Sequence, residues 1–338
     1  MTLTDSPAPT PPSPSAKPPA RRRTGVTVVL WLLVVPGALW FLGRAFGLER
    51  GALIMLFAGT PFVAAWTLIP FLAALVARRW ATAIVAGIVA AGMAVCVLPR
   101  ALPDRDQGPT EGVALRVLTI NTLYGEADAA QIVQLVRDGD VGVLAVQEFT
   151  PRGESALKAA GIGDLLPHQQ LTAARDAGGS GLYSRYPMLT RSTRDNDGGF
   201  QQATATIQPD GAAPVYLESV HPLAPAGPDM YDGWRSDIRE QPAAGGDGPA
   251  KILLGDFNAT LDHGVLRDLI DTGYRDAAST VGKGLVPSWP AFNGSRGLVT
   301  IDHVLVDERI GVRDVEVHSV TDSDHRAIFA SLVLPAGS

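Results

Sequence analysis

The stretch KILLGDFNAT, residues 251–260, carries an apolar run directly into a carboxylate and a carboxamide. Ile252, Leu253 and Leu254 predict a buried strand, and Asp256 and Asn258 follow where that strand ends. Gly, Asp and Asn are also ordinary turn residues, so the stretch alone leaves a structural turn and a catalytic strand end as equal alternatives. A catalytic site needs partners from other segments, because such sites are assembled from several strand ends.

The chain around this stretch alternates short apolar runs with amphipathic segments. Runs such as ALRVLTINT, VGVLAVQE and VYLESVHP predict strands, whereas ADAAQIVQLVRD and HGVLRDLID predict helices. This mixture predicts an α/β domain in which two sheets pack face to face with helices outside. We place the domain at residues 114–334, a length sufficient to bury its own core.

Polar side chains gather where the predicted strands begin or end. Taken singly, each has a structural explanation, such as a turn for Asn121, a helix cap for Glu148 and a loop for His221. Taken together, they supply oxygen ligands for a hard cation, a base that activates water and donors to an oxyanion. The set consists of Asn121, Glu148, His221, Asp256, Asn258, Asp302, Asp324 and His325.

Several separated segments, in chain order, resemble the endonuclease/exonuclease/phosphatase superfamily, the metal-dependent phosphoesterases related to DNase I and exonuclease III. The segments are TINTLYG, AVQE, GLYSRYP, HP, GDFNAT, SWPA, IDHVLV and SDHRAI. The resemblance covers residues 114–334. It implies a four-layer α/β/β/α sandwich of the DNase I type and hydrolysis of a phosphoester.

The resemblance also implies a divalent metal, Mg²⁺ or Mn²⁺. Asn121 and Glu148 would contact this metal, and Asp324 would join it or its water shell.

For the reaction itself, the resemblance implies five further roles. His221 would donate to the scissile phosphate, and Asp256 would orient or deprotonate the attacking water. Asn258 would bind the phosphate or the transition state beside it. His325 would face the phosphate, and Asp302 would hold the other ring nitrogen of His325.

Three long apolar runs precede this domain and predict membrane helices at about 26–47, 52–77 and 80–98. Each run is near or above the ~20 residues that cross ~30 Å of hydrocarbon. A cleaved signal peptide is the alternative for the first run, because Arg21, Arg22 and Arg23 precede it. Cys96, the only cysteine, lies in the third run, so no intrachain disulfide and no paired-cysteine metal site can form.

The segments that flank these runs predict a topology. Residues 1–23 are Pro-rich and predict a disordered cytoplasmic N-terminus. The basic residues at 21–23 and 78–79 lie on one side, which predicts a multi-pass membrane protein with an extracytoplasmic catalytic domain. Residues 100–113 predict a flexible linker, and ~14 such residues span ~20 Å.

The net charge of the predicted domain indicates which partners it binds. After residue 110 the chain holds 18 of its 28 Lys and Arg but 30 of its 34 Asp and Glu. An acidic domain offers little general attraction to a nucleic-acid backbone, so the bilayer and a phosphate-containing substrate, including a lipid-linked one, are the expected partners. An exported nuclease and a non-catalytic binding module of the same fold remain as alternatives.

A narrower resemblance concerns the whole chain. Three helices followed by this domain, with an Ala-, Arg- and Gly-rich composition, resemble the membrane-anchored branch found in actinobacteria, including the VanJ-type proteins associated with teicoplanin resistance. This implies a role at the cell envelope.

Overall fold

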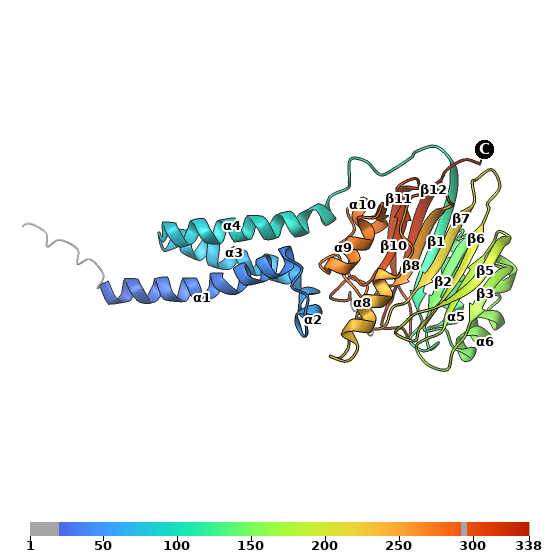
Figure 1. Ribbon diagram of the computed structural model, residues 1–338, viewed down its shortest axis with the longest axis horizontal. Coiled ribbons are helices and arrows are strands. Elements are labelled where there is room, and N and C mark those ends of the chain that lie inside the picture. Colours follow the sequence, from blue (N-terminus) through green and yellow to red (C-terminus); the bar gives the residue numbers. More distant parts are fainter. Residues whose placement is uncertain (1–19, 292–295, 338) are drawn as a thin grey trace, which may run out of the picture.

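The computed structural model describes residues 20–291 and 296–337, in which a bundle of apolar helices joins a globular α/β domain (Figure 1). Residues 1–19, most of the segment expected to be disordered, lie outside the described residues. The first helix begins at Ala20, a few residues before the expected start.

The N-terminal bundle contains three main helices and two short ones. They are α1 (Ala20–Ala45), α2 (Leu53–Phe57), α3 (Thr60–Val76), α4 (Trp80–Val97) and the 3₁₀ turn η1 (Leu98–Ala101). Within the described residues, two stretches are long and apolar enough to cross a membrane, Thr24–Ala45 and Trp80–Ala101, and α3 is a shorter apolar helix. A signal sequence near an N-terminus meets the same criterion, so this finding by itself gives only weak support for an anchor.

The second apolar run differs from the single helix expected over 52–77. The helix ends at Phe57 and restarts at Thr60, with Pro61 in the first turn of α3. In a continuous helix the Pro61 ring would clash with the carbonyl of Phe57, four residues earlier. The Thr60 hydroxyl instead donates to that carbonyl at 2.6 Å.

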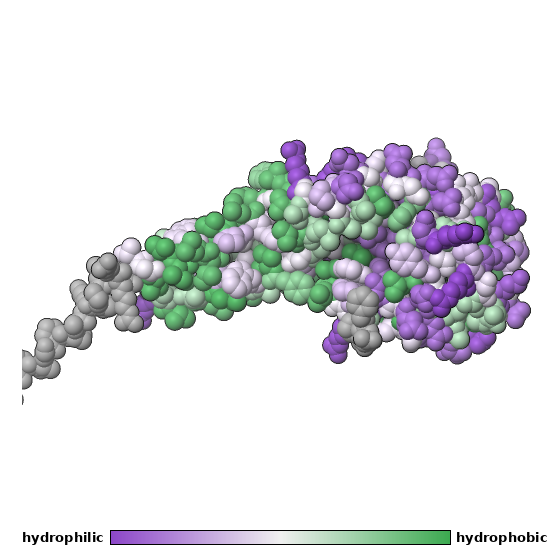
Figure 2. All heavy atoms as spheres, turned by 90° about the horizontal axis from the view of Figure 1, so that it is seen from below, coloured by the Kyte–Doolittle hydropathy of each residue, from purple (hydrophilic) through white to green (hydrophobic). Residues whose placement is uncertain are grey.

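The outer surface of the bundle is apolar, in contrast to the globular domain (Figure 2). Leu32, Ile88 and Val95 expose 68%, 65% and 74% of their area. Helices of a soluble protein normally present a polar face to water. An apolar surface of this extent indicates contact with lipid or with another protein.

Two six-stranded sheets form the globular domain. The first has the order β11-β12-β1-β2-β4-β3, and the second has the order β5-β6-β7-β8-β10-β9. The first contains β1 (Val113–Asn121), β2 (Val143–Gln147), β3 (His168–Thr172), β4 (Ser180–Ser184), β11 (Gly311–Ser319) and β12 (Arg326–Leu334). The second contains β5 (Met188–Asp195), β6 (Gln201–Ile207), β7 (Val215–Val220), β8 (Ala250–Asp256), β9 (Tyr274–Asp276) and β10 (Asp302–Asp307).

The sheets pack face to face and helices cover both outer faces, as the predicted four-layer sandwich requires. Buried side chains such as Val117, Leu217 and Ile252 fill the space between the sheets. A second apolar cluster lies under α5 and α6, and a third lies under α8 and α9. The helices are α5 (Ala129–Asp138), α6 (Pro151–Ala159), α7 (Ile162–Leu165), α8 (Tyr231–Arg239), α9 (Gly264–Ile270) and α10 (Ala277–Thr280).

The bundle is docked on the domain through the loop between β8 and α9. Asp262 is fully buried and accepts hydrogen bonds from Arg44 at 2.7 Å and from Arg100 at 2.5 Å. His263 contacts the carbonyl of Ile54 through its Nε2 atom at 2.8 Å. The Ile54 side chain is fully buried in the apolar cluster under α8 and α9, so this segment of the bundle is part of the domain core.

The linker at 100–113 is held against the domain rather than free, in contrast to the expected flexible tether. The Asp104 N–H donates to the Thr280 carbonyl at 2.9 Å, and the Val312 N–H donates to the Gln107 carbonyl at 2.8 Å. Arg275 donates to the carbonyl of Asp106 at 2.7 Å. Together with the Asp262 contacts, these bonds fix the domain on the bundle.

Candidate active site

The polar residues expected at the site lie at one edge of the paired sheets because of strand direction. In the first sheet β1 and β2 are parallel, so Asn121 and Glu148 leave their ends side by side. In the second sheet β7 and β8 are also parallel, and β10 runs antiparallel to β8, which pairs Asp302 with Asp256. The start of β12, antiparallel to β1, brings Asp324 and His325 to the same edge.

Asn121 connects the two sheets at this edge. Its side-chain Nδ2 donates to Glu148 Oε1 at 3.1 Å and to Asp256 Oδ2 at 3.1 Å. Glu148 is further held by the main-chain N–H of Tyr124, which donates to Oε2 at 2.9 Å. Carboxylates from both sheets therefore share one amide, and they lie close enough to act on one small group.

His325 lies between two carboxylates. Its Nδ1 atom is 3.0 Å from Asp302 Oδ2, and its Nε2 atom is 3.6 Å from Asp256 Oδ2. The hydroxyl of Ser288 accepts the main-chain N–H of Asp302 at 3.2 Å. The Asp302 carboxylate thus holds one ring nitrogen, as expected, and turns the other toward Asp256.

His221 and Asn258 flank Asp256. His221 is buried, with its Nε2 atom 3.7 Å from Asp256 Oδ2 and its ring against Phe200. The Asn258 main-chain N–H donates to Asp256 Oδ1 at 2.8 Å, but its side-chain amide donates to the Pro222 carbonyl at 3.1 Å. Asp324 joins through its Oδ1 atom, which lies 3.9 Å from His325 Nε2. Seven of the eight expected side chains therefore form one connected cluster, and the Asn258 side chain bonds outside it.

Burial and neighbouring charges set the protonation of the cluster. Burial lowers the pKa of His221 to about 4, which keeps this imidazole neutral at pH 7. Burial also disfavours charge on His325, but the carboxylates of Asp302 and Asp256 outweigh it and raise its pKa to about 10. Burial raises the pKa of Asp256 and of Glu148 above that of an exposed carboxyl.

The donor set fits a hard divalent cation, and two places in it offer ligands. Asp256, Asp302 and His325 present ligand atoms that all lie within 4.8 Å of one another. The His325 ring is already bonded to Asp302 and faces Asp256, so Glu148 is the better position for a cation. The Asn121 amide turns its nitrogen to Glu148, and its oxygen accepts the Leu123 N–H at 3.0 Å. Among the described buried side-chain atoms, Asp324 Oδ1 has no hydrogen-bond partner, which suits a third, water-mediated contact.

Backbone strain marks the same residues. Glu148 has φ of 51° and Asn258 has φ of 49°, a region that non-glycine residues rarely adopt. Such conformations persist where the surrounding contacts hold them, and they cluster at functional sites. Glu148 directly follows β2, and Asn258 lies two residues after the end of β8.

Several residues that support the cluster were not predicted. Ser323 donates from its hydroxyl to the Asn121 carbonyl at 2.8 Å and accepts the His325 N–H at 3.0 Å. Gln147 donates to the Ser219 hydroxyl at 2.9 Å and joins the sheets beneath the site. For these supporting residues, the sequence offered one signal, which is the position of Ser323 two residues before His325 in the segment SDH.

Two arginines of the domain, Arg185 and Arg235, do not reach the cluster. Arg185 pairs with Asp140 at 2.8 Å, at the end of β4 opposite to the cluster. Arg235 pairs with Asp232 at 3.0 Å and donates to the Glu49 carbonyl at 2.7 Å. Arg185 therefore lies at the surface, and Arg235 belongs to the contact with the bundle.

Solved structures share this fold. An endonuclease/exonuclease/phosphatase from Beutenbergia cavernae DSM 12333 has a TM-score of 0.54 and 17% identity over 66% of this chain and 72% of its own. A humanized D. rerio TDP2 with 14 mutations has a TM-score of 0.52 and 14% identity over 65% of this chain and 98% of its own. Sphingomyelinase C from Streptomyces griseocarneus has a TM-score of 0.47 and 16% identity over 65% of this chain and 99% of its own. At these identities the first two structures show the fold alone, and no conclusion is drawn from the third.

No curated protein matches the chain. The Endonuclease/Exonuclease/phosphatase family model matches residues 118–325, a range that begins in β1 and ends at His325. Because this range holds every residue of the cluster and most of both sheets, the chain belongs to that family.

Proposed function

We propose that this chain is a membrane-anchored, divalent-metal-dependent phosphoesterase. The observation that carries the proposal is the cluster itself, in which Glu148, Asp256 and His325 come together from both sheets. A binding module of the same fold would have no chemical need for a buried base, a charged imidazole and an oxygen-rich cation site in one place.

Each side chain of the cluster has a role that its contacts support. Asp256 is placed to orient the attacking water and to take its proton. His325, charged and held by Asp302, donates toward the phosphate oxygens, where negative charge develops in the transition state. His221 is neutral, so one of its ring nitrogens carries a proton and would donate it in a hydrogen bond to the scissile phosphate.

The metal would be held by Glu148 and Asp324. Asn121, whose amide nitrogen faces Glu148, would join them through its oxygen only after its amide turns. When bound, Mg²⁺ or Mn²⁺ supplies Lewis-acid polarisation of the phosphoryl group. Asn258 binds the phosphate in this proposal only if its side chain leaves the Pro222 carbonyl.

We further propose that α1, α3 and α4 anchor the enzyme with an inside N-terminus and an extracytoplasmic domain. The packing of α1 supports three retained helices rather than a cleaved leader. Trp40 donates to the Thr60 hydroxyl at 3.0 Å, and Arg44 binds buried Asp262. Cleavage after α1 would remove Arg44, and the buried carboxylate of Asp262 would then lose one of its positively charged partners.

The proposed substrate is a phosphoester or pyrophosphate bond of a lipid-linked cell-envelope molecule. The fixed docking of the domain on the helices and its acidic charge support this choice over nucleic acid. In its narrowest form, the proposal assigns the chain to the VanJ-type branch, with a role in glycopeptide resistance.

The activity is tested with the full chain in a neutral detergent. We expect turnover of a phosphoester with added Mg²⁺ or Mn²⁺, none after EDTA, and none in Glu148→Ala at unchanged circular dichroism. The panel contains a polyprenyl pyrophosphate, phospholipid, sugar phosphates and single- and double-stranded DNA. Full turnover after exhaustive EDTA treatment contradicts the metal, and faster turnover of DNA than of every lipid contradicts the substrate.

The role of Asp302 is tested against a matched histidine–aspartate pair outside the cluster. Asp276 lies 2.7 Å from His303 in a similarly buried pair. We expect Asp302→Asn to lower kcat by ~10²-fold or more with little change in KM, the scale for a disabled acid–base group. Asp276→Asn, at equal folded fraction, is expected to leave kcat within severalfold of the wild type. Equal losses in both variants, or a change in KM alone for Asp302→Asn, would show that Asp302 has no special role.

The topology is tested with C-terminal fusions. Three crossings place Ser338 outside when Arg21 to Arg23 stay inside. A C-terminal alkaline phosphatase is therefore expected to be active, and a green fluorescent protein exported unfolded is expected to stay dark. The reverse pattern would place the catalytic domain in the cytoplasm.

A further inference from the structure

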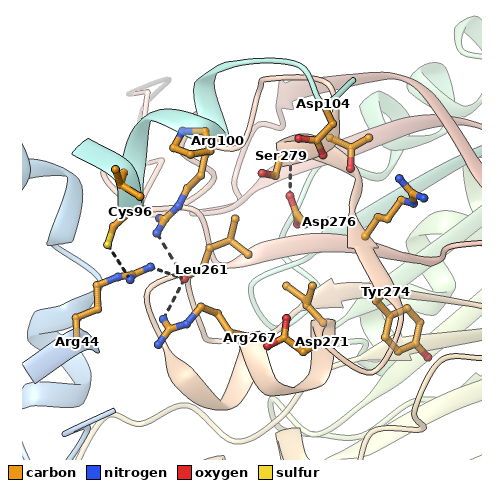
Figure 3. A pocket seen from close by; sticks show the side chains of 15 residues that line it. Arg44, Cys96, Arg100, Asp104, Leu261, Arg267, Asp271, Tyr274, Asp276 and Ser279 are labelled. Atoms are coloured by element: carbon orange, nitrogen blue, oxygen red, sulfur yellow. Dashed lines mark hydrogen bonds between the residues drawn. The ribbon is translucent and has the colours of Figure 1, made fainter. Parts of the chain in front are cut away.

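A cavity of about 510 Å³ lies where the ends of α1 and α4 meet the catalytic domain. Its walls come from the last turn of α1, from the end of α4 at Cys96, and from the segments around α9 and α10 (Figure 3). Pro99 of η1 also lines it. None of its lining residues belongs to the cluster at the strand ends.

Three guanidinium groups converge at the helix side of this cavity. Arg44, Arg100 and Arg267 all reach the Leu261 carbonyl, at 3.5, 3.5 and 3.2 Å (Figure 3). Arg44 and Arg100 are nearly buried, with 11% and 8% of their side chains exposed. Three like charges in a partly buried place require compensation by negative charge.

The described carboxylates compensate this group incompletely. Asp262 serves both Arg44 and Arg100, and Glu49 accepts the Gly264 main-chain N–H beside Arg267. Burial lowers the pKa of the nearby His263, so this residue adds no charge of its own at pH 7. At the helix side of the cavity, three guanidinium groups thus face two carboxylates, Asp262 and Glu49, and this side has one positive charge in excess.

Two of the guanidinium groups have N–H donors whose present acceptors are weaker than an anion would be. Arg267 donates to the carbonyls of Leu261 and Asp262, and among the described residues it pairs with no carboxylate. Burial and the neighbouring Arg44 lower its pKa below that of an exposed arginine. Arg44 Nη1 contacts the Cys96 sulfur at 3.1 Å, a weak acceptor for a charged donor.

The far wall of the cavity holds three carboxylates and Arg275, whose charge is paired with Asp106 at 2.9 Å, so this wall is negative on balance. Asp104 and Asp271 are exposed at its rim, and Asp276 is paired with His303. An anion is therefore confined to the arginine side, next to the apolar end of α4. If α1 and α4 cross the bilayer, their ends at Arg44 and Val97 lie at the level of the lipid headgroups.

We propose that this cavity binds the phosphate of an anionic phospholipid headgroup, with Arg44, Arg100 and Arg267 as its donors. The inference rests on the proposed membrane anchoring but not on phosphoester hydrolysis. The lipid phosphate would supply the missing negative charge and charge-assisted hydrogen bonds. It would also cover the Cys96 thiol, the only thiol of the chain.

The test uses the full chain in neutral detergent with soluble dihexanoyl lipids. Dihexanoyl phosphatidylglycerol, dihexanoyl phosphatidylcholine and inorganic phosphate are added at equal concentrations. The first readout is the rate at which a maleimide labels Cys96, and the second is the thermal unfolding midpoint. Both measure binding without turnover, so they give a result even if the catalytic proposal fails.

We expect phosphatidylglycerol to slow the labelling of Cys96 by about fivefold or more and to raise the unfolding midpoint. Phosphatidylcholine and inorganic phosphate are expected to do much less. Arg267→Gln should remove most of the effect, and Arg267→Lys should restore part of it. Arg191→Gln, the same charge change at an exposed residue of β5, should behave as the wild type.

Equal protection by phosphatidylcholine, or full protection in Arg267→Gln, would overturn the proposal. Equal protection by inorganic phosphate would assign the cavity to free phosphate and overturn the lipid assignment. If Cys96 labels too slowly to measure, the unfolding midpoint decides, and the absence of a phosphatidylglycerol-specific rise that Arg267→Gln removes would also overturn it.

Discussion

The contact on which the site depends is the hydrogen bond from the Asn121 amide to Asp256, which joins the ends of two separate sheets. The bond forms because β1 and β8 point their ends to the same edge, and because Gln147 and Ser219 fix the distance between the sheets beneath it. A buried amide and carboxylate must be paired with good geometry, since either one left unpaired is costly. The sandwich therefore sets the relative positions of Glu148, Asp256 and His325: the Asn121 amide joins the two carboxylates, and His325 Nε2 lies 3.6 Å from Asp256.

The same loop serves both the site and the bundle. Asn258 follows Asp256, and four residues later Asp262 enters the contact with Arg44 and Arg100. Trp234 links the two, because its indole N–H donates to the Asn258 carbonyl at 3.1 Å and its ring packs edge-on to His263. A displacement of the bundle would thus reach the catalytic edge through a short chain of buried groups.

The sequence predicted the parts of the molecule that have local signals. Apolar runs that end in Asp256 or precede His325 mark both the strands and the polar edge, and seven of the eight expected side chains do come together. Asn258 illustrates a limit, because its presence beside Asp256 was predictable whereas its bond to the Pro222 carbonyl depends on tertiary packing. The break before Pro61 had a local signal in the sequence, and a single helix over 52–77 was expected despite it.

Contacts between distant segments had no such signal. Arg44 and Asp262 are 218 residues apart, and nothing in either segment indicates the other. The linker at 100–113 reads as flexible by composition, and only its bonds to Thr280 and Val312 reveal that it is held. Ser219 alternates within a strand like any polar residue, so its role beneath the site could not be inferred.

The central claim is that Glu148 and its neighbours hold a divalent cation at this edge, and anomalous diffraction tests it most directly. In crystals of the full chain soaked with Mn²⁺, the account predicts an anomalous peak within about 2.5 Å of a Glu148 carboxylate oxygen. The peak should vanish in crystals of Glu148→Gln. No peak at this edge, or a peak on Asp256, Asp302 and His325 that persists in Glu148→Gln, would contradict the account.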